Sequence, residues 1–392
     1  MNPPRRGTPD FLLLFLTFVL VCFGLAMVFS ASYYIKVDTP HHYLKTQGIA
    51  VIIGSIGLIA AMNIHYTKLQ KLVVPLFLST VVMLVLVLLV GDEQNNAKSW
   101  INIGPLNLQP TEFAKIGIVL YLANLISKKE EKFRNFKTGL LPALIIITII
   151  VVLIMLQPDF GSCMILLAGA FLVVVVGGAN LKHLFLIGLA GVSMLALGLG
   201  SYLLKNGFEQ YQLARITSFM NPWSEDCQQD QCYQIVQSLY AFGHGGITGA
   251  GFGQGIQKLQ YLPQAYNDFI FAIIGEEFGF IGTTFFLIIY LLFIWRGIIV
   301  ALRCPNTFGA LTGLGLMGMI AIQTLINIGG VTSSIPMTGV TLPLISYGGS
   351  SILATLLSLG ILLGISREQS LPAEKDERPQ ARSTTKKPSM HL

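Results

Sequence analysis

The stretch FLLLFLTFVLVCFGLAMVFSASYYI, residues 11–35, contains no charged side chain. A helix needs roughly 20 consecutive apolar residues to cross the hydrocarbon core of a bilayer, so this stretch is long enough to form one span. It is too long for the apolar region of a cleavable signal peptide. The stretch therefore predicts a first transmembrane helix.

The same pattern recurs along the chain, because the few charged residues are clustered. Only 11% of the 392 residues are charged and 53% are hydrophobic, whereas soluble globular chains carry about 25% charged residues. The charge-free interval between Arg303 and Arg367 alone is 63 residues long. This composition excludes an ordinary cytosolic enzyme, a disordered protein and a secreted disulfide scaffold. It indicates a polytopic helical membrane protein, since a spanning segment must satisfy its own backbone hydrogen bonds.

The predicted fold class is an all-α polytopic membrane protein with ten transmembrane helices. The expected spans are residues 11–33, 46–64, 72–91, 110–127, 138–157, 162–179, 184–204, 268–295, 307–329 and 347–366. Between the last two, residues 329–351 are rich in Gly, Ser, Thr and Pro, which is typical of a re-entrant or cavity-lining loop. With the N-terminus inside, 18 of the 25 lysines and arginines are cytoplasmic, as the positive-inside rule requires. An even number of spans places both termini in the cytoplasm.

The chain is expected to form one membrane domain, residues 1–367, followed by a disordered cytoplasmic tail, residues 368–392. The polar composition of that tail cannot build a core. The cytoplasmic loops are short, whereas one large extracytoplasmic loop, about residues 205–267, connects the seventh and eighth spans. Polar segments of this length are usually functional. The loop holds Cys227 and Cys232, which could pair, while the other cysteines lie in or beside apolar segments.

Charged residues inside apolar segments are candidates for function, because they are costly in a membrane. Glu112 and Lys115 stand at the outer start of the fourth span, and their i, i+3 spacing places them on one helix face. They form either an ion pair that orients the span or the charged wall of an outward-facing cavity. Asp159 follows a proline between two spans, where an aspartate is often only a cap.

Asp268 is the sharpest candidate for a catalytic residue. It stands where the large loop enters the eighth span, and Glu276 and Glu277 follow in the same expected helix. An aspartate at a helix N-terminus complements the helix dipole, but three carboxylates in one apolar span exceed what capping needs. At i+8, Glu276 lies closer to the Asp268 face than Glu277 does.

The outer side also carries cations, against the general charge trend. Lys205, Arg215 and Lys258 are either solvated loop charges or contacts for an anionic group, and a guanidinium suits bidentate contact with phosphate. His244 stands among glycines without a second His or Cys at ligand spacing, so we predict a structural role. Trp100 precedes the fourth span and is either an interfacial belt residue or a platform on which a sugar stacks.

Four motifs occur in the order that is characteristic of one family. They are QPTEFAK (109–115), QPDFG (157–161), DFIF (268–271) followed by Glu276 and Glu277, and PLISYGGSS (343–351). Together they resemble the SEDS family (shape, elongation, division and sporulation), which includes FtsW, RodA and SpoVE. The resemblance extends from the first span to about Arg367. Within the family, residues 327–331 and 341–343 look most like FtsW of Gram-positive type.

The resemblance implies a peptidoglycan glycosyltransferase that polymerises lipid II on the outer face of the plasma membrane. Asp268 matches the family's essential acidic residue. Other matched positions are implied to be substrate-binding or to line a cavity: Trp100, Glu112, Lys115, Asp159 and Arg215. We add three candidates from their place in the sequence: Lys258, Glu276 and Ser346.

The reaction joins the 4-hydroxyl group of an acceptor sugar to the anomeric carbon of a lipid-diphosphate donor, with inversion. We expect Asp268 to act as the general base, and Lys115, Arg215 and Lys258 are candidates for contact with the diphosphate. A divalent cation, Mg²⁺ or Mn²⁺, could share the diphosphate, and the sequence leaves its ligands open. No organic cofactor is expected. Small residues near Gly161 and within 346–351 would allow close packing around a groove for the polyprenyl chain.

The resemblance also implies partners and a location. These are lipid II and the growing lipid-linked glycan, a class B penicillin-binding protein that acts as transpeptidase, other division proteins and membrane lipid, but no nucleic acid. The expected location is the bacterial plasma membrane at the division septum. Two alternatives stay open. A lipid-precursor flippase or transporter would need functional charges near the bilayer midplane, and a non-enzymatic scaffold for a transpeptidase would not need Asp268.

Overall fold

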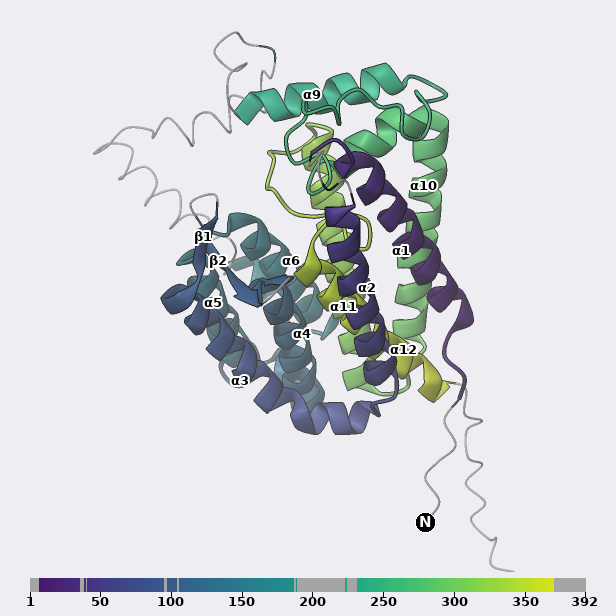
Figure 1. Cartoon of the computed structure of the whole chain (residues 1–392). Helices are drawn as coiled ribbons and strands as arrows, with labels where there is room; N and C mark the ends of the chain where they lie inside the picture. The colour runs from purple at the N-terminus through teal and green to yellow at the C-terminus, as the bar shows by residue number, and fades with distance from the viewer. Residues whose placement is uncertain are drawn as a thin grey trace, which may run out of the picture.

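The computed structural model describes residues 7–35, 39, 41–94, 97–103, 106–186, 188, 223 and 231–369. Within these residues the chain is a bundle of long apolar helices (Figure 1). The helices are α1 (Phe11–Ser32), α2 (His42–Met62), α3 (Tyr66–Val90), α4 (Pro110–Lys129), α5 (Leu141–Met155), α6 (Phe160–Val176), α9 (Gln231–Gly245), α10 (Ile270–Leu302), α11 (Thr307–Val331) and α12 (Gly349–Gln369). A short 3₁₀ turn (Glu130–Arg134) and a π turn (Phe136–Leu140) connect α4 to α5.

Helices occupy nine of the ten predicted spans, whereas residues 184–204, the expected seventh span, lie almost entirely outside the described residues. Within the described part of the chain, seven helices are long and apolar enough to cross a membrane. The helices α4 and α6 are not among those seven, and α6 is only 17 residues long. The chain is therefore a multi-pass helical membrane protein, while the count of ten spans stays a prediction.

The connection between α3 and α4 corrects the prediction of an all-α chain. It forms a small antiparallel sheet in which β1 (Asp92–Gln94) pairs with β2 (Ala97–Ile103), and β2 pairs with β3 (Leu106–Leu108). Strand β2 carries Trp100, Ile101 and Ile103, which are aromatic and β-branched side chains that suit strands. The spacing of charges, on which the spans were predicted, carries no information about such a short connection.

The loop predicted at 205–267 contains a helix that the charge pattern did not indicate. Helix α9 lies across one end of the bundle and packs against α10 (Figure 1). From Gly246 the chain returns to α10 without further helix. The part of this loop before residue 231 lies outside the described residues, apart from Trp223.

Helix α10 is interrupted at Gly279, whose φ of 63° and ψ of −169° are not helical. Residues 246–251 dock into this break through four backbone hydrogen bonds of 2.9–3.1 Å, two to carbonyls before the break and two from N–H groups after it. A Cβ at Gly279 would lie 2.2 Å from the Gly249 nitrogen. The position therefore requires glycine, and the loop satisfies the backbone groups that the break leaves unpaired.

The two described ends of the chain meet at the end of the bundle opposite α9 (Figure 1). The Gly7 N–H donates to the Arg367 carbonyl at 3.1 Å, and the Asp10 N–H donates to Ser366 Oγ at 3.0 Å. Asp10 also caps α1 and accepts hydrogen bonds from the Arg296 guanidinium at 2.7–3.1 Å. Both described ends therefore lie on the same side of the bundle.

Two groups of buried apolar side chains form the core, one around α1, α10 and α12 and the other around α3–α6. Many large apolar side chains nevertheless face outward, including Phe18, Leu89 and Phe285. Helices that are apolar on all sides are typical of a membrane environment. The exposed apolar surface therefore agrees with the prediction of a membrane protein.

Candidate functional site

Residues 338–351, which connect α11 to α12 and include the motif 343–351, are the segment near which Asp268 and several other predicted residues lie. As expected, the segment is non-helical as far as α12, which begins at Gly349. Helices α1 and α6 approach its backbone through glycines: a Cβ at Gly24 would lie 2.4 Å from the Leu344 oxygen, and one at Gly161 would lie 2.8 Å from the Thr338 oxygen. The small residues near Gly161 thus pack against the protein's own chain.

Asp268 lies beside this segment, in the turn before α10. Phe269, and not Asp268, is the N-cap residue of α10, so the structure does not support the capping alternative for Asp268. Its Oδ2 faces Gly339, where an added Cβ would stand 3.8 Å away, and Asn327 Nδ2 donates to its main-chain oxygen at 2.8 Å.

The Asp268 carboxylate is poorly solvated at one oxygen. Oδ1 is enclosed and has no hydrogen-bond partner among the described residues, although the residue as a whole keeps partial solvent contact. Asp268 precedes the first residue of the spanning helix Ile270–Leu302. Burial raises the pKa of Asp268 to about 7, because a charged carboxylate is disfavoured away from water.

Three tyrosines from distant segments form an aromatic patch next to Asp268. The ring centroids of Tyr43 and Tyr266 are 4.5 Å apart. The ring centroid of Tyr347 lies 5.2 Å from that of Tyr43 and 5.6 Å from that of Tyr266. Tyr266 is two residues before Asp268, and its main-chain oxygen accepts a 2.9 Å hydrogen bond from the Tyr347 N–H. Burial, with a hydrogen bond between the Tyr266 and Tyr43 hydroxyl groups and the charge of Asp268, raises the pKa of Tyr266.

Glu276 is fully buried and organises the loop that docks into the α10 break. Its carboxylate accepts hydrogen bonds from the Ile256 N–H at 2.7 Å and the Gln257 N–H at 3.2 Å, and it lies 2.9 Å from His244 Nδ1. The structural role predicted for His244 is therefore confirmed. Glu276 shapes the region before Asp268 through the backbone of this loop.

The sequence suggested that Lys258 is a free cation on the outer side. The structure shows it buried and paired instead. The residue is 3% exposed, and its Nζ lies 2.6 Å from Glu277 Oε1 and 2.8 Å from Ser30 Oγ. Ser30 Oγ also donates to Glu277 Oε1 at 2.5 Å. This geometry argues against the hypothesis of diphosphate contact, because the charge of Lys258 is already neutralised by a buried carboxylate that joins α1, α10 and the loop.

Glu112 and Lys115 form the predicted ion pair on one face of α4, with a distance of 2.9 Å between Oε1 and Nζ. Lys115 Nζ also donates to Gln323 Oε1 at 2.7 Å. The pair borders a small internal cavity of about 30 Å³, which is about the size of one water molecule. The ion-pair alternative is therefore confirmed, whereas the charged wall of an outward-facing cavity stays a prediction.

Asp159 caps α6, as the simpler interpretation predicted. Its Oδ1 accepts from the Ser162 N–H at 3.0 Å, and its Oδ2 accepts from Gln109 Nε2 at 3.1 Å. The Gln109 N–H in turn donates to Ser350 Oγ at 2.8 Å. Asp159 therefore joins the starts of α4 and α6 next to the 338–351 segment.

The remaining predicted residues divide into three cases. Trp100 is partly buried on β2, where its Cα pairs with Asp92, and either role predicted for it stays possible. Ser346 is buried and stabilises its own turn, since its Oγ accepts from the Leu342 N–H at 2.8 Å. Arg215, like Lys205 and the side chains of the possible disulfide, lies outside the described residues.

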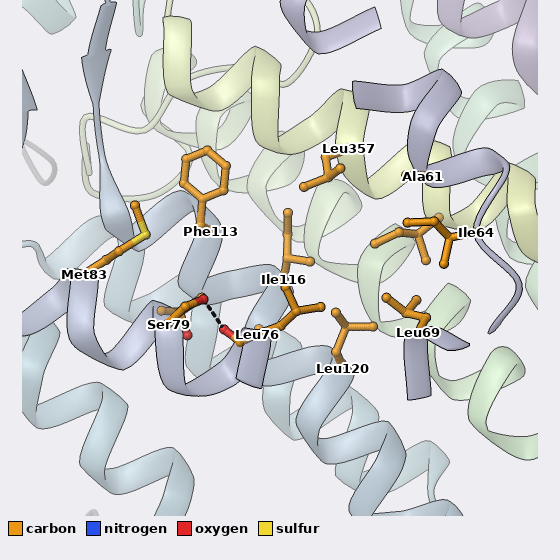
Figure 2. Close-up of a pocket in the computed structure, with 13 residues that line it drawn as sticks. Ala61, Ile64, Leu69, Leu76, Ser79, Met83, Phe113, Ile116, Leu120 and Leu357 are labelled. Carbon is orange, nitrogen blue, oxygen red and sulfur yellow. Dashed lines mark hydrogen bonds between the residues drawn. The ribbon is translucent and has the colours of Figure 1, made fainter. Parts of the chain in front are cut away.

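An apolar cavity of about 240 Å³ lies apart from these polar groups, between α2, α3, α4 and α12. Figure 2 shows Ile116 and Leu120 of α4 near Leu76 of α3, with Leu357 of α12 above them and Phe113 to one side. Its full lining is Ala61, Ile64, Leu69, Leu76, Ser79, Thr80, Met83, Phe113, Ile116, Gly117, Leu120, Leu357 and Ile361. The cavity is suited to an apolar chain.

Sequence reasoning missed the side-chain amides that hold the 338–351 segment. Gln47 of α2 donates to the Ser346 oxygen at 3.2 Å and accepts from the Gly348 N–H at 3.1 Å. Gln323 and Asn327 of α11 make comparable bonds. Their only signal in the sequence is that they are amides inside apolar spans.

The described residues contain no group of three or more His, Cys, Asp or Glu side chains that could hold a metal ion. The buried Asp268 Oδ1 beside the 338–351 segment has no hydrogen-bond partner among the described residues. Any divalent cation at this site would therefore need most of its ligands from a substrate and from water.

Comparison with known proteins agrees with this architecture. The family model for the cell cycle proteins FtsW, RodA and SpoVE matches residues 11–371. The chain is 40% identical over 368 residues to stage V sporulation protein E of Bacillus subtilis, covering 93% of this chain and 98% of that protein. It is 36% identical over 362 residues to a probable peptidoglycan glycosyltransferase FtsW of Geobacter metallireducens, covering 91% and 94% respectively.

Solved structures show the same likeness. A chain from a study of how a peptidoglycan synthase complex coordinates polymerization and crosslinking matches with a TM-score of 0.75 and 32% identity, covering 92% of this chain and 98% of that one. The rod shape determining protein RodA of Thermus thermophilus matches with a TM-score of 0.66 and 30% identity, covering 93% and 98%.

Proposed function

The chain belongs to the FtsW/RodA/SpoVE family of cell cycle proteins, and from this premise we propose how its residues act. It is a peptidoglycan glycosyltransferase, the activity for which its FtsW relatives are named. The proposed reaction polymerises lipid II into glycan strands at the outer face of the plasma membrane. The 4-hydroxyl group of the acceptor sugar attacks the anomeric carbon of the donor, and the lipid-linked diphosphate leaves.

Asp268 is the proposed general base, and one observation carries this assignment. Its buried Oδ1 has no hydrogen-bond partner among the described residues, and the residue as a whole keeps partial solvent contact, so the carboxylate is not committed to the fold and can accept the proton of the attacking hydroxyl group. A pKa raised to about 7 makes the carboxylate a stronger base than an ordinary aspartate at the pH where it works. General-base assistance of this kind contributes about 100- to 10,000-fold to a rate.

The leaving diphosphate needs positive charge that the described lysines of the site do not offer. Lys115 and Lys258 are both buried in ion pairs with glutamates. We therefore assign contact with the diphosphate to Arg215, as the family resemblance implies. A guanidinium provides bidentate hydrogen bonds to phosphate oxygens.

A divalent cation, Mg²⁺ or Mn²⁺, fits this proposal only as a companion of the diphosphate. The described residues lack a preformed cluster of three ligands, and Mg²⁺ commonly binds through one or two carboxylates, substrate phosphates and water. Such an ion would neutralise charge on the leaving group. No organic cofactor takes part in the proposal.

The apolar cavity between α2, α3, α4 and α12 is the proposed place for part of the polyprenyl chain. Its lining is almost entirely aliphatic or aromatic (Figure 2). Filling it by Met83→Trp should lower kcat/KM for lipid II with a long chain more than for a short-chain analogue. Equal loss for both substrates would contradict this assignment.

The proposed topology has ten spans with both termini in the cytoplasm. The described ends of the chain meet each other at one end of the bundle, where Arg296 binds Asp10. Helix α9 lies at the opposite end, which supports an outer position for the loop that precedes Asp268. Lipid II polymerisation on the outer surface requires this orientation.

A class B penicillin-binding protein is the proposed transpeptidase partner, together with other division proteins at the septum. A structurally similar chain comes from a study of a synthase complex that coordinates polymerization and crosslinking. The resemblance of residues 327–331 and 341–343 to FtsW favours division over sporulation. A fluorescent fusion should concentrate at the septum in growing cells, and uniform labelling of the lateral wall would contradict the septal role.

The decisive experiment measures lipid II polymerisation by the purified protein, alone and with its cognate transpeptidase. Wild type should form glycan chains, whereas Asp268→Asn should form none. The matched control is Glu368→Gln, which removes a carboxylate paired with His65 at the other end of the bundle and should leave the rate unchanged. Polymer from Asp268→Asn at the wild-type rate would overturn the base assignment. No polymer from folded wild type with its partner would favour lipid transport or a scaffold.

A further inference from the structure

Asn327 makes an unusual pair of contacts inside α11. The residue is 2% exposed, and its Nδ2 donates to two main-chain oxygens, that of Asp268 at 2.8 Å and that of Val340 at 2.7 Å. These acceptors lie 59 residues before and 13 residues after Asn327. One side-chain amide thus joins the turn before α10 to the 338–351 segment.

The two carbonyls that Asn327 joins flank the Asp268 carboxylate. Val340 follows Gly339, whose φ of 72° is in the left-handed region that favours glycine. A Cβ at Gly339 would stand 3.8 Å from Asp268 Oδ2. The amide therefore fixes both the backbone that carries the carboxylate and the backbone that faces it.

The orientation of the Asn327 amide follows from these contacts. A reversed amide would point Oδ1 at two carbonyl oxygens, which cannot donate a hydrogen bond. In the observed orientation both Nδ2 hydrogens are used, while Oδ1 is buried without a partner among the described residues. An unmet buried acceptor is costly. The buried Oδ1 without a partner indicates that the two hydrogen bonds donated by Nδ2 are the reason for an amide at residue 327.

Gln323, one turn earlier on the same face of α11, holds the same segment at the next residue. Its Nε2 donates to the Thr341 oxygen at 2.9 Å, while its Oε1 accepts from Lys115 Nζ at 2.7 Å. Lys115 is itself bound to Glu112. The α4 ion pair thus reaches the neighbourhood of Asp268 through an amide of α11.

We propose that Asn327 is a positioning residue that holds Asp268 against the Gly339–Val340 turn, and that Lys115 acts on the same segment through Gln323. The proposal rests on the proposed function, in which Asp268 is the base. Under it, Lys115 orients protein and does not bind the diphosphate. A displacement of about 1 Å at a reacting group is enough to cost roughly 100-fold in rate, so two hydrogen bonds to its backbone can control turnover.

The test compares Asn327→Ala with wild type in lipid II polymerisation, over a range of pH, using the full-length protein and its transpeptidase. We expect kcat to fall on the order of 100-fold, with KM for lipid II changed less than about threefold. The acidic limb of the kcat profile should also move to lower pH by roughly one unit, because a released Asp268 becomes better solvated. Tyr266, backed by Tyr43 and Tyr347, is the titratable neighbour of Asp268 among the described residues, and it is unchanged in this variant.

Thr324→Val is the matched control, since it removes a buried polar group from α11 at a position three residues before Asn327. Thr324 Oγ1 contacts the Ile320 oxygen and Tyr290 Oη, and Tyr290 Oη donates to the Pro343 oxygen, so the control perturbs the same segment without touching Asp268 or Val340. The control should lower the thermal midpoint without moving the acidic limb. If Asn327→Ala does not yield folded protein, Asn327→Ser replaces it, with a smaller fall in kcat and a limb shifted in the same direction.

The Lys115 arm is tested in a Glu112→Gln background, which avoids a stranded carboxylate. In this background, Lys115→Met and Gln323→Leu should each lower kcat. The variant that combines both should lower kcat by less than about a further twofold. A fully multiplicative loss, or a raised KM from Lys115→Met alone, would show that Lys115 contacts substrate.

Two outcomes separate this proposal from the proposed function. If Asp268→Asn is inactive while Asn327→Ala (or its Ser replacement) keeps the wild-type kcat or an unshifted limb, the positioning role is overturned and the base assignment stands. If Asp268→Asn polymerises normally, the base assignment itself fails. If the acidic limb of the kcat profile shifts in Asn327→Ala and Asp268→Asn is inactive, both the positioning role of Asn327 and the base assignment are supported.

Discussion

Replacing Lys258 tests whether its charge serves the fold or the substrate. In the structure the ammonium group and the Glu277 carboxylate are 2.6 Å apart, and both residues are at most 3% exposed. At an effective dielectric constant of 20, two unit charges at this separation attract by about 6 kcal/mol. Desolvation offsets much of that gain, but removing one partner of a buried pair typically costs about 3–5 kcal/mol, because the other charge stays buried.

Lys258→Met should therefore lower the thermal midpoint of the detergent-solubilised protein by roughly 5 °C or more. The double variant Lys258→Met with Glu277→Gln removes both charges and lets Ser30 keep a hydrogen-bond acceptor. It should recover most of the lost stability. Lys45→Met, at an exposed position on α2, is the matched control and should leave the midpoint unchanged.

The activity of the double variant decides between the two roles. If Lys258 is structural, the double variant should polymerise lipid II within about threefold of wild type, because the loop that leads to Asp268 is again held in place. If Lys258 binds the diphosphate, the double variant should be stable but should show a raised KM. A stable, inactive double variant, or a single variant with an unchanged midpoint, would refute the reasoning from the buried pair.

Three other changes have definite expectations. The polymerisation rate should fall as pH is lowered through about 7, because Asp268 must be ionised to act as a base and its pKa is raised to about 7; a flat rate between pH 8 and 6 would contradict this. Gly161→Ala should reduce activity on the order of tenfold and lower the thermal midpoint, since its Cβ would lie 2.8 Å from the Thr338 oxygen; wild-type values in both assays would count against the close packing. Asp10→Ala should cost about 1–2 kcal/mol of stability, because Asp10 caps α1 and binds Arg296. It should leave the polymerisation rate unchanged, because these contacts are far from Asp268. Thermal denaturation checks the loss of stability, and the polymerisation assay checks the rate.

The positions of charges were enough to predict most of the helices. A charged side chain is costly in hydrocarbon, so long stretches with few or no charges predict spans, and helices indeed occupy nine of the ten predicted spans. The same reasoning placed Glu112 and Lys115 on one face of α4, where they form an ion pair. It also selected Asp268, whose carboxylate is not used for capping.

Contacts between distant segments could not be predicted in this way. The role of Lys258 depends on Ser30, which is 228 residues away, and no local spacing reports that distance. The break in α10 is similar, because residues 270–302 qualify as a single span by length and hydropathy, and the loop that fills the break comes from an earlier part of the sequence. A glycine in an apolar helix has many possible reasons, and only the docked loop identifies this one.

The 338–351 segment explains why polar but uncharged residues carry so much of this site. Irregular backbone within a membrane domain is tolerated where it is buried in protein, and its N–H and C=O groups then need partners from neighbouring helices. Charged side chains would satisfy them at a high desolvation cost, whereas a side-chain amide offers donors and an acceptor without net charge. Gln47, Gln323 and Asn327 each supply two hydrogen bonds in this region. The helices can therefore remain apolar enough to cross the membrane while they fix the one carboxylate that the proposed reaction needs.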